Sequence, residues 1–157
     1  MLCELRVKNL ALIESLELSL EHGEGTGLVV MTGETGAGKS IMMRAIQLLF
    51  GGRASADWIR TGADSCEVEA LFELHRHHPG LLEKLEESGF GEEGQLVIRR
   101  VFTSAGRSRF FVNGSLATAS GVAQLTGELL SVAGQHDHQQ LLQPSLHLDI
   151  LATYGDV

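Results

Sequence analysis

The chain has 157 residues, enough for one domain, and carries a formal net charge of −8 at pH 7. That charge argues against a general polyanion-binding protein, because phosphate contacts need a concentrated positive surface, although a local basic patch can depart from the average. Two cysteines are too few for a disulfide framework, and no apolar run approaches the ~20 residues that span a bilayer, so we expect a cytoplasmic chain without a membrane partner.

The N-terminal segment alternates polar and apolar side chains with the period of two that is typical of β-strands. The pattern predicts two antiparallel strands, one from Leu2 to Lys8 and one from Ile13 to Leu20, joined near Asn9-Leu10-Ala11.

The next segment spells G-x-x-x-x-G-K-[ST] in full from Gly33 to Ser40, directly after the apolar run Leu28-Val29-Val30-Met31. We expect a buried strand over that run and, after the motif, a helix from Lys39 to about Phe50 that Gly51-Gly52 terminates. This helix is apolar on nearly every side, which predicts burial against a sheet. Strand, glycine-rich loop and helix together form a P-loop, which binds a nucleoside triphosphate.

Each residue type in the motif has a specific role in binding the triphosphate and Mg²⁺. The glycines let backbone N–H groups approach the β-phosphate, Lys39 reaches the β- and γ-phosphates, and the Ser40 hydroxyl ligates Mg²⁺. The positive end of the helix faces the same anion. ATP and Mg²⁺ are therefore the predicted cofactors, with a binding set of Gly33, Glu34, Thr35, Gly36, Ala37, Gly38, Lys39, Ser40 and Ile41.

The remaining elements are predicted from periodicity and turn signals. They are a strand over Cys66–Leu74, a helix from Pro79 to Ser88, a hairpin of Gln95–Phe102 with Ser108–Val112, a turn at Asn113-Gly114, a helix from Thr118 or Ser120 that ends before Gly134, and a helix from about Ser145. Residues 129–133 fit either the end of a helix or a strand.

Two kinds of side-chain cluster invite a functional interpretation. Arg99, Arg100, Arg107 and Arg109 flank one turn; solvated arginines on one face of two strands are favoured over a nucleic-acid contact. The segments His75-Arg76-His77-His78 and His136-Asp137-His138 lack the spacing of a zinc site, so no such metal site is predicted there.

Hydrolysis by a P-loop ATPase needs an aspartate, usually followed by a glutamate, at the end of an apolar strand. No apolar run in this sequence ends in that pair, and no L-S-G-G segment is present to clamp a nucleotide across a dimer. The chain therefore carries half of an active site, and we expect it to be inactive as an isolated ATPase.

Four segments together resemble the N-terminal head segment of the RecN family, bacterial double-strand-break repair proteins among the SMC-like ATPases. They are L-R-V-K-N-L-A-L-I-E-S-L-E-L-S-L from Leu5 to Leu20, G-L-V-V-M-T-G-E-T-G-A-G-K-S from Gly27 to Ser40, F-F-V-N-G from Phe110 to Gly114, and A-G-Q-H-D-H-Q from Ala133 to Gln139. The resemblance implies an α/β P-loop NTPase head of the ABC/SMC type. Residues 1–157 would form its N-terminal lobe, in which an antiparallel strand layer lies beside a parallel sheet and the P-loop helix.

The same resemblance implies roles for further residues. Lys39 and Ser40 match the Walker A lysine and Mg²⁺ ligand, and Gln135 matches the Q-loop glutamine that contacts Mg²⁺ and the attacking water. Arg60, in W-I-R-T-G, matches an arginine of SMC-type heads that faces nucleotide or DNA. The implied partners are ATP, a C-terminal lobe of the same protein, a second head in a head-to-head homodimer, and double-stranded DNA or DNA ends near the nucleoid.

The predicted function is accordingly the ATP-binding half of a repair ATPase head, whose ATP-driven dimerisation tethers DNA ends. Two alternatives remain open. A nucleotide-dependent interaction module without hydrolysis fits the missing carboxylates. A transporter-type cassette ATPase is expected to place an adenine-stacking aromatic residue before the P-loop, where this chain has none.

Overall fold

The structure is a computed structural model that describes residues 2–20, 32, 37–74, 79–87, 89–90, 94–127 and 129. The chain divides into two compact units, Met1–Gly127 and Glu128–Val157. All described helices and strands belong to the first unit.

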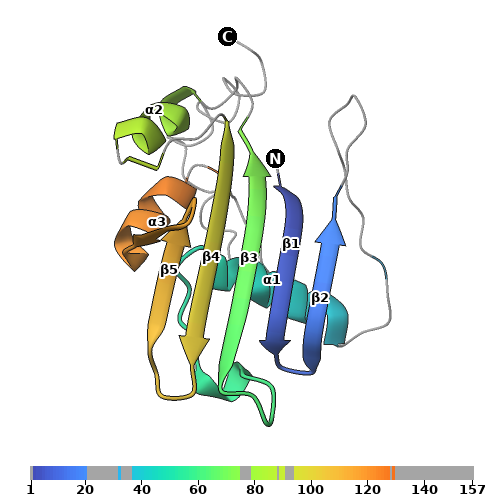
Figure 1. The fold of residues 1–157 in the computed structure, drawn as a ribbon. Helices are drawn as coiled ribbons and strands as arrows, with labels where there is room; N and C mark the ends of the chain where they lie inside the picture. The colour runs from blue at the N-terminus through green and yellow to red at the C-terminus, as the bar shows by residue number, and fades with distance from the viewer. Residues whose placement is uncertain are drawn as a thin grey trace, which may run out of the picture. The chain divides into compact units, whose positions relative to one another are not determined.

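A six-stranded sheet with the order β2-β1-β3-β4-β5-β6 forms the centre of this unit (Figure 1). Every pairing within it is antiparallel. The strands are β1 Leu2–Leu10, β2 Ile13–Ser19, β3 Ser65–Glu73, β4 Gln95–Thr103, β5 Ser108–Val112 and β6 Ser115–Ala117. Five of them match predicted strands, whereas β6 was not predicted.

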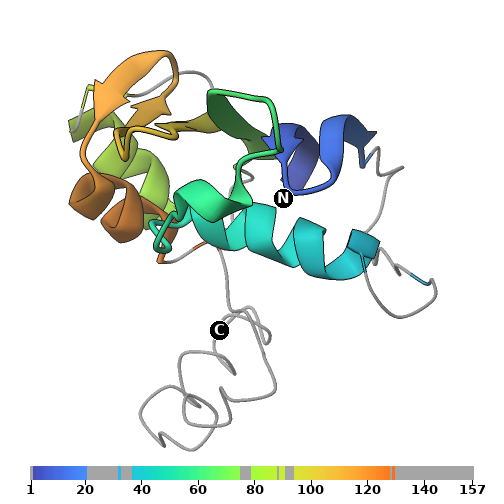
Figure 2. The same ribbon diagram turned by 90° about the horizontal axis from the view of Figure 1, so that it is seen from below.

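Helices cover one side of the sheet. They are α1 Ala37–Leu49, the short 3₁₀-helix η1 Ala56–Trp58, α2 Pro79–Glu87 and α3 Ala119–Thr126. Figures 1 and 2 show α1, α2 and α3 on the same face, which we call the inner face, and no described helix on the opposite, outer face. None of the described helices is both long and apolar enough to cross a membrane.

Strict alternation in the strands divides these two faces. In β3 the side chains of Cys66, Val68, Ala70 and Phe72 are buried on the inner face, and the residues between them are only half-buried. Strand β4 repeats the pattern in register with β3. The core therefore lies between the inner face and the helices, as expected for a sheet with one packed side.

The predicted turns agree with the backbone. Asn113 and Gly114 both have positive φ, 45° and 81°, as a tight two-residue hairpin requires. The Asn113 side chain also accepts a hydrogen bond from the Val97 backbone N–H at 2.7 Å and donates one to the Phe90 carbonyl at 2.7 Å. Thr118 caps α3 by accepting from the Gly121 N–H at 3.0 Å.

The P-loop helix α1 packs against the sheet, as its apolar sequence predicted, and contacts β1, β3 and β4. Its buried side chains are Met42, Ala45, Leu48 and Leu49, which lie on one side, whereas Met43 is 42% exposed. The strand predicted for residues 28–31 lies outside the described residues, as does the helix predicted from about Ser145.

Candidate nucleotide-binding site

The candidate site begins at the N-terminal end of α1. The helix starts at Ala37, so Gly38, Lys39 and Ser40 form its first turn, and all three are exposed. The first N–H groups of a helix have no partner within the helix, and this first turn contains no acidic residue that would compensate the positive end of the dipole. The exposed end of α1 is thus suited to bind an anion.

Gly38 adds a steric observation. A Cβ atom built on Gly38 meets nothing within 4 Å outside its own helix. Packing of the described chain therefore does not require glycine at this position. Close approach of a phosphate to the backbone, as in a P-loop, does require it.

The other predicted contacts of the P-loop fall into two groups. Ile41, in the next helical position, is half-buried. The motif residues Gly33, Glu34, Thr35 and Gly36 lie outside the described residues, as does the candidate catalytic and Mg²⁺-contacting Gln135.

The C-terminal end of α1 is held by an arginine from the sheet. Arg100 on β4 is only 6% exposed, and its Nη1 donates to the backbone carbonyls of Leu48 at 2.8 Å and Gly52 at 2.5 Å. Its Nε donates to the Ser108 hydroxyl at 3.0 Å. The guanidinium also stacks over the Phe110 ring, with Cζ 4.4 Å from the ring centroid.

Arg100 supplies what α1 lacks in its own sequence. The last turn of α1 contains no basic residue, and a cation at the negative end of a helix is stabilising. Gly51, with φ of 86°, ends the helix as predicted. Burial lowers the pKa of the Arg100 guanidinium, yet an arginine in a protein stays charged, so the cap is permanently cationic.

This position of Arg100 corrects the interpretation of the arginine cluster as solvated residues on one face. Arg100 points to the inner face and is buried, whereas Arg99 lies on the outer face and stacks on Phe111 at 4.5 Å. Arg107 and Arg109 are exposed in the turn and on β5. The four side chains therefore do not form one patch, and Arg100 cannot contact DNA in this fold.

Cys66 lies on the inner face of β3. Burial raises the pKa of its thiol to about 12, with Glu67 adding to the shift and Arg100 opposing it. The thiol is therefore neutral near pH 7 and is no candidate nucleophile.

Arg60 lies beside the turn between β1 and β2. Its backbone N–H donates to the Asn9 carbonyl at 3.0 Å, and its guanidinium pairs with Glu14 at 3.4 Å. The neighbouring Trp58 carbonyl accepts from the Ala11 N–H at 2.7 Å, and Arg44 of α1 stacks on the Trp58 ring at 4.4 Å. The Arg60 side chain is 41% exposed, which leaves it accessible to a ligand.

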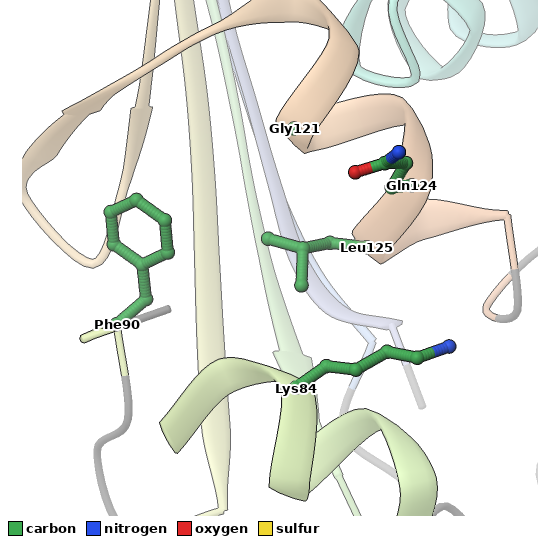
Figure 3. Close-up of a pocket in the computed structure, with 5 residues that line it drawn as sticks. All are labelled: Lys84, Phe90, Gly121, Gln124 and Leu125. Carbon is green, nitrogen blue, oxygen red and sulfur yellow. The ribbon is translucent and has the colours of Figure 1, made fainter. Parts of the chain in front are cut away.

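A pocket of about 440 Å³ lies between α2 and α3. Figure 3 shows Leu125 of α3 pointing towards Phe90, with Lys84 on α2 and Gln124 on α3 nearby. The described residues of the P-loop, Gly38 to Ser40, are not among the residues that line this pocket. The described residues also contain no group of three or more side chains that could hold a metal ion, and the two histidine clusters lie outside the described residues.

Comparison with known proteins identifies the family of the chain. Residues 4–149 match the family described as AAA domain. The protein named DNA repair protein RecN from Halalkalibacterium halodurans is 43% identical over 152 residues, which is 96% of this chain and 26% of that protein. RecN from Bacillus subtilis is 43% identical over 155 residues, 99% of this chain and 26% of that protein.

Among solved structures, the Smc head domain with an extended coiled coil bound to the C-terminal domain of ScpA, derived from Pyrococcus furiosus, superposes with a TM-score of 0.68. It is 23% identical, and the match covers 97% of this chain and 42% of that chain. The predicted fold class, an ABC/SMC-type P-loop head, is thereby confirmed, as is the resemblance to the N-terminal segment of RecN. The chain spans about a quarter of the length of the curated relatives it matches, 26% in both cases.

Proposed function

The chain belongs to the AAA domain family, and from this premise we propose that it is the ATP-binding part of a RecN-like ATPase head that acts in DNA repair. One observation carries the proposal. The last three residues of a complete P-loop motif, Gly38 to Ser40, lie exposed in the first turn of α1, which contains no acidic residue and has open space beside Gly38.

In this proposal the backbone from Gly33 to Gly38 surrounds the β-phosphate, Lys39 contacts the β- and γ-phosphates, and Ile41 lies at the edge of the site. Ser40 ligates the Mg²⁺ ion, which supplies charge neutralisation on the phosphates when it is bound. Gln135 and Arg60 are proposed second contacts, to Mg²⁺ with the attacking water and to nucleotide or DNA, respectively.

Hydrolysis requires carboxylates that this sequence does not provide in the expected place. We therefore propose that a C-terminal lobe of the same protein completes the active site, and that two heads pair around ATP. The exposed side of α1 supports a covering lobe, because Met43 is 42% exposed there. ATP turnover would then separate heads that hold double-stranded DNA or DNA ends.

A second candidate function is a nucleotide-dependent interaction module that does not hydrolyse ATP. The missing carboxylates favour it for this chain by itself. Steady phosphate release by the isolated chain, abolished by Lys39→Ala, would contradict both the second candidate and the expectation that the chain is inactive alone.

The nucleotide site is tested by Lys39→Ala. We expect the affinity for a fluorescent ATP analogue to fall at least tenfold, because the ammonium contacts two phosphates, and a tenfold change corresponds to about 1.4 kcal/mol. Lys84→Ala, which removes an exposed lysine of α2, is the matched control and is expected to leave the affinity unchanged. Equal affinity in Lys39→Ala and the parent would refute the P-loop assignment.

A further inference from the structure

The strands β4, β5 and β6 form a basic region in an acidic chain. Residues 94–127 contain four arginines and no aspartate or glutamate, although the net charge of the whole chain is −8. Arg100 of this set is buried on the inner face, and Arg107 is exposed in the turn between β4 and β5. The outer face of the three strands carries what we call the β4–β6 patch: Val97, Arg99, Val101, Arg109, Phe111 and Leu116.

The charges beside this patch are drawn apart. Glu69 of β3 lies directly opposite Arg99 in the register, yet its carboxylate pairs at 3.3 Å with Arg6 of β1, on the far side of β3. Arg99 stacks on the Phe111 ring of β5, with Cζ 4.5 Å from the ring centroid. Within the described part of the chain, neither Arg99 nor Arg109 forms an ion pair. A stacked guanidinium keeps its in-plane N–H groups available for an incoming carboxylate.

The β4–β6 patch is also apolar and partly hollow. Leu116 is 67% exposed, and Val101 is half-buried. No described helix covers this face of the sheet (Figures 1 and 2). A cleft of about 300 Å³ opens on it, lined by Glu69, Val97, Arg99, Phe111, Asn113 and Gly114.

We propose that the β4–β6 patch binds a short acidic segment of a partner protein, in which carboxylates lie beside aromatic or aliphatic side chains. One carboxylate accepts from the in-plane N–H groups of Arg99, and a second accepts from Arg109. An apolar side chain of the segment enters the cleft and packs on Val97 and Phe111. Charge-assisted hydrogen bonds and apolar burial are thereby combined on one small surface.

The surroundings of the patch favour such a segment over nucleic acid. Three carboxylates of β3, Glu67, Glu69 and Glu73, share the outer face, about 5 Å from β4 and within a Debye length of the arginines. Duplex DNA is a rod with one negative charge per about 1.7 Å of its axis, so it would extend over these carboxylates. A short peptide segment can remain on the three basic strands, and its apolar side chains match Phe111 and Leu116.

The size of the patch sets the expected affinity. On ordinary strand spacing and rise, the outer face of β4 to β6 covers roughly 250 Å², well below the area of a stable protein interface. Binding is therefore expected to be transient, with a dissociation constant on the order of 100 μM. It is also expected to weaken with salt, because the charges are exposed to solvent.

A labelled peptide tests the chemistry of the partner by fluorescence anisotropy. The probe is a short synthetic peptide of the repeat E-S-F-S, which places glutamate and phenylalanine on one side when the peptide is extended. We expect it to bind the nucleotide-free chain. Two matched peptides, one with glutamine for glutamate and one with serine for phenylalanine, are each expected to bind roughly fivefold more weakly.

Substitutions locate the binding surface. Arg99→Gln with Arg109→Gln is expected to weaken binding of the acidic peptide about tenfold, because both carboxylate contacts are lost. Lys8→Gln with Arg53→Gln removes the same charge from exposed positions elsewhere; this control is expected to stay within about twofold of the parent. Glu69→Gln is expected to strengthen binding about twofold, because it removes a carboxylate that lines the cleft.

Several results would overturn the proposal: a parent that does not bind the peptide at about 1 mM, some ten times the expected dissociation constant, an arginine variant that binds like the parent, or a glutamine peptide that binds like the glutamate peptide. A short DNA duplex that binds the parent and not the arginine variant, while the peptide binds neither, would show a nucleic-acid surface instead.

Circular dichroism checks the folding of each variant. If the arginine variant fails to fold, Leu116→Ser tests the same surface at a side chain that is 67% exposed. It is expected to weaken peptide binding about threefold, because an apolar contact is lost. Peptide binding is expected to persist in Lys39→Ala, so failure of the nucleotide proposal and failure of this one are distinguishable.

Discussion

The two ends of α1 differ in their contacts with the rest of the described chain. At the C-terminal end, Arg100 reaches from β4 and donates to the carbonyls of Leu48 and Gly52. At the N-terminal end, the first turn is exposed and contains no carboxylate. Among the described residues, Arg100 thus satisfies the negative end of the helix, and the first turn at the positive end holds no acidic side chain, which suits a phosphate-binding helix.

The largest expected effect comes from removing the hydrogen bonds that Arg100 donates at the C-terminal end of α1. Arg100→Met keeps much of the side-chain volume but removes the donors, so the carbonyl of Leu48 loses its cap in a buried place. We expect the free energy of unfolding to fall by roughly 3 kcal/mol, in the range for breaking a buried charged network. Urea unfolding measures this change.

Two comparisons make that result specific. Arg100→Lys keeps the charge but loses the planar fork, so an intermediate loss is expected. Arg107→Met, in the exposed turn, is expected to change stability by less than about 0.5 kcal/mol. If Arg100→Met were as stable as the parent, the cap would not hold α1 against the sheet.

The burial of Arg100 could have been predicted from its position in the alternating pattern of β4. It occupies the inward phase of β4, in line with Leu96, Ile98 and Phe102, and a period of two therefore places it in the core. Interpreting the arginines by their number and proximity ignored this phase. The signal was present, but the partner carbonyls on α1 are distant in sequence and could not be predicted from it.

In the rest of the fold too, features set by local sequence were predicted and features set by contacts between distant segments were not. Alternation predicted five of the strands and the hairpin of β4 with β5, and Asn113-Gly114 predicted a turn, because these signals depend on local geometry. The position of β1 between β2 and β3 depends on contacts between distant segments, and β6, Ser115–Ala117, is too short to show a period. The one-sided burial of α1 depends on which elements pack against it, which its own residues do not encode.

The substitution Gly38→Ala tests whether the exposed N-terminal turn of α1 binds phosphate. Alanine is about 1 kcal/mol more favourable than glycine within a helix, and its Cβ meets nothing within 4 Å, so stability is expected to rise slightly. Affinity for the ATP analogue is expected to fall about tenfold, because the Cβ projects where a phosphate approaches the backbone. Thermal unfolding and equilibrium titration measure the two quantities separately.

Opposite signs for stability and affinity are the signature of this site. Gln47→Ala, at an exposed position in the same helix, is the control; it is expected to change stability slightly and affinity not at all. A Gly38→Ala variant that binds the analogue as tightly as the parent would show that the N-terminal turn of α1 does not contact phosphate.

The smallest expected effect comes from removing one hydrogen bond of Arg100, the residue that caps the C-terminal end of α1. Ser108→Ala removes the acceptor of the Arg100 Nε donor, a part-buried contact of 3.0 Å, and is expected to cost about 1 kcal/mol of stability. Ser104→Ala, in the exposed turn between β4 and β5, is the control and is expected to leave the free energy of unfolding nearly unchanged.

The decisive measurement is a double-mutant cycle of Arg100→Met and Ser108→Ala. In the Arg100→Met background the donor is already gone, so Ser108→Ala is expected to cost nothing further. An unchanged cost in that background would mean that Ser108 stabilises β5 by itself, and that the cap on α1 rests on the backbone carbonyls and the Phe110 ring alone.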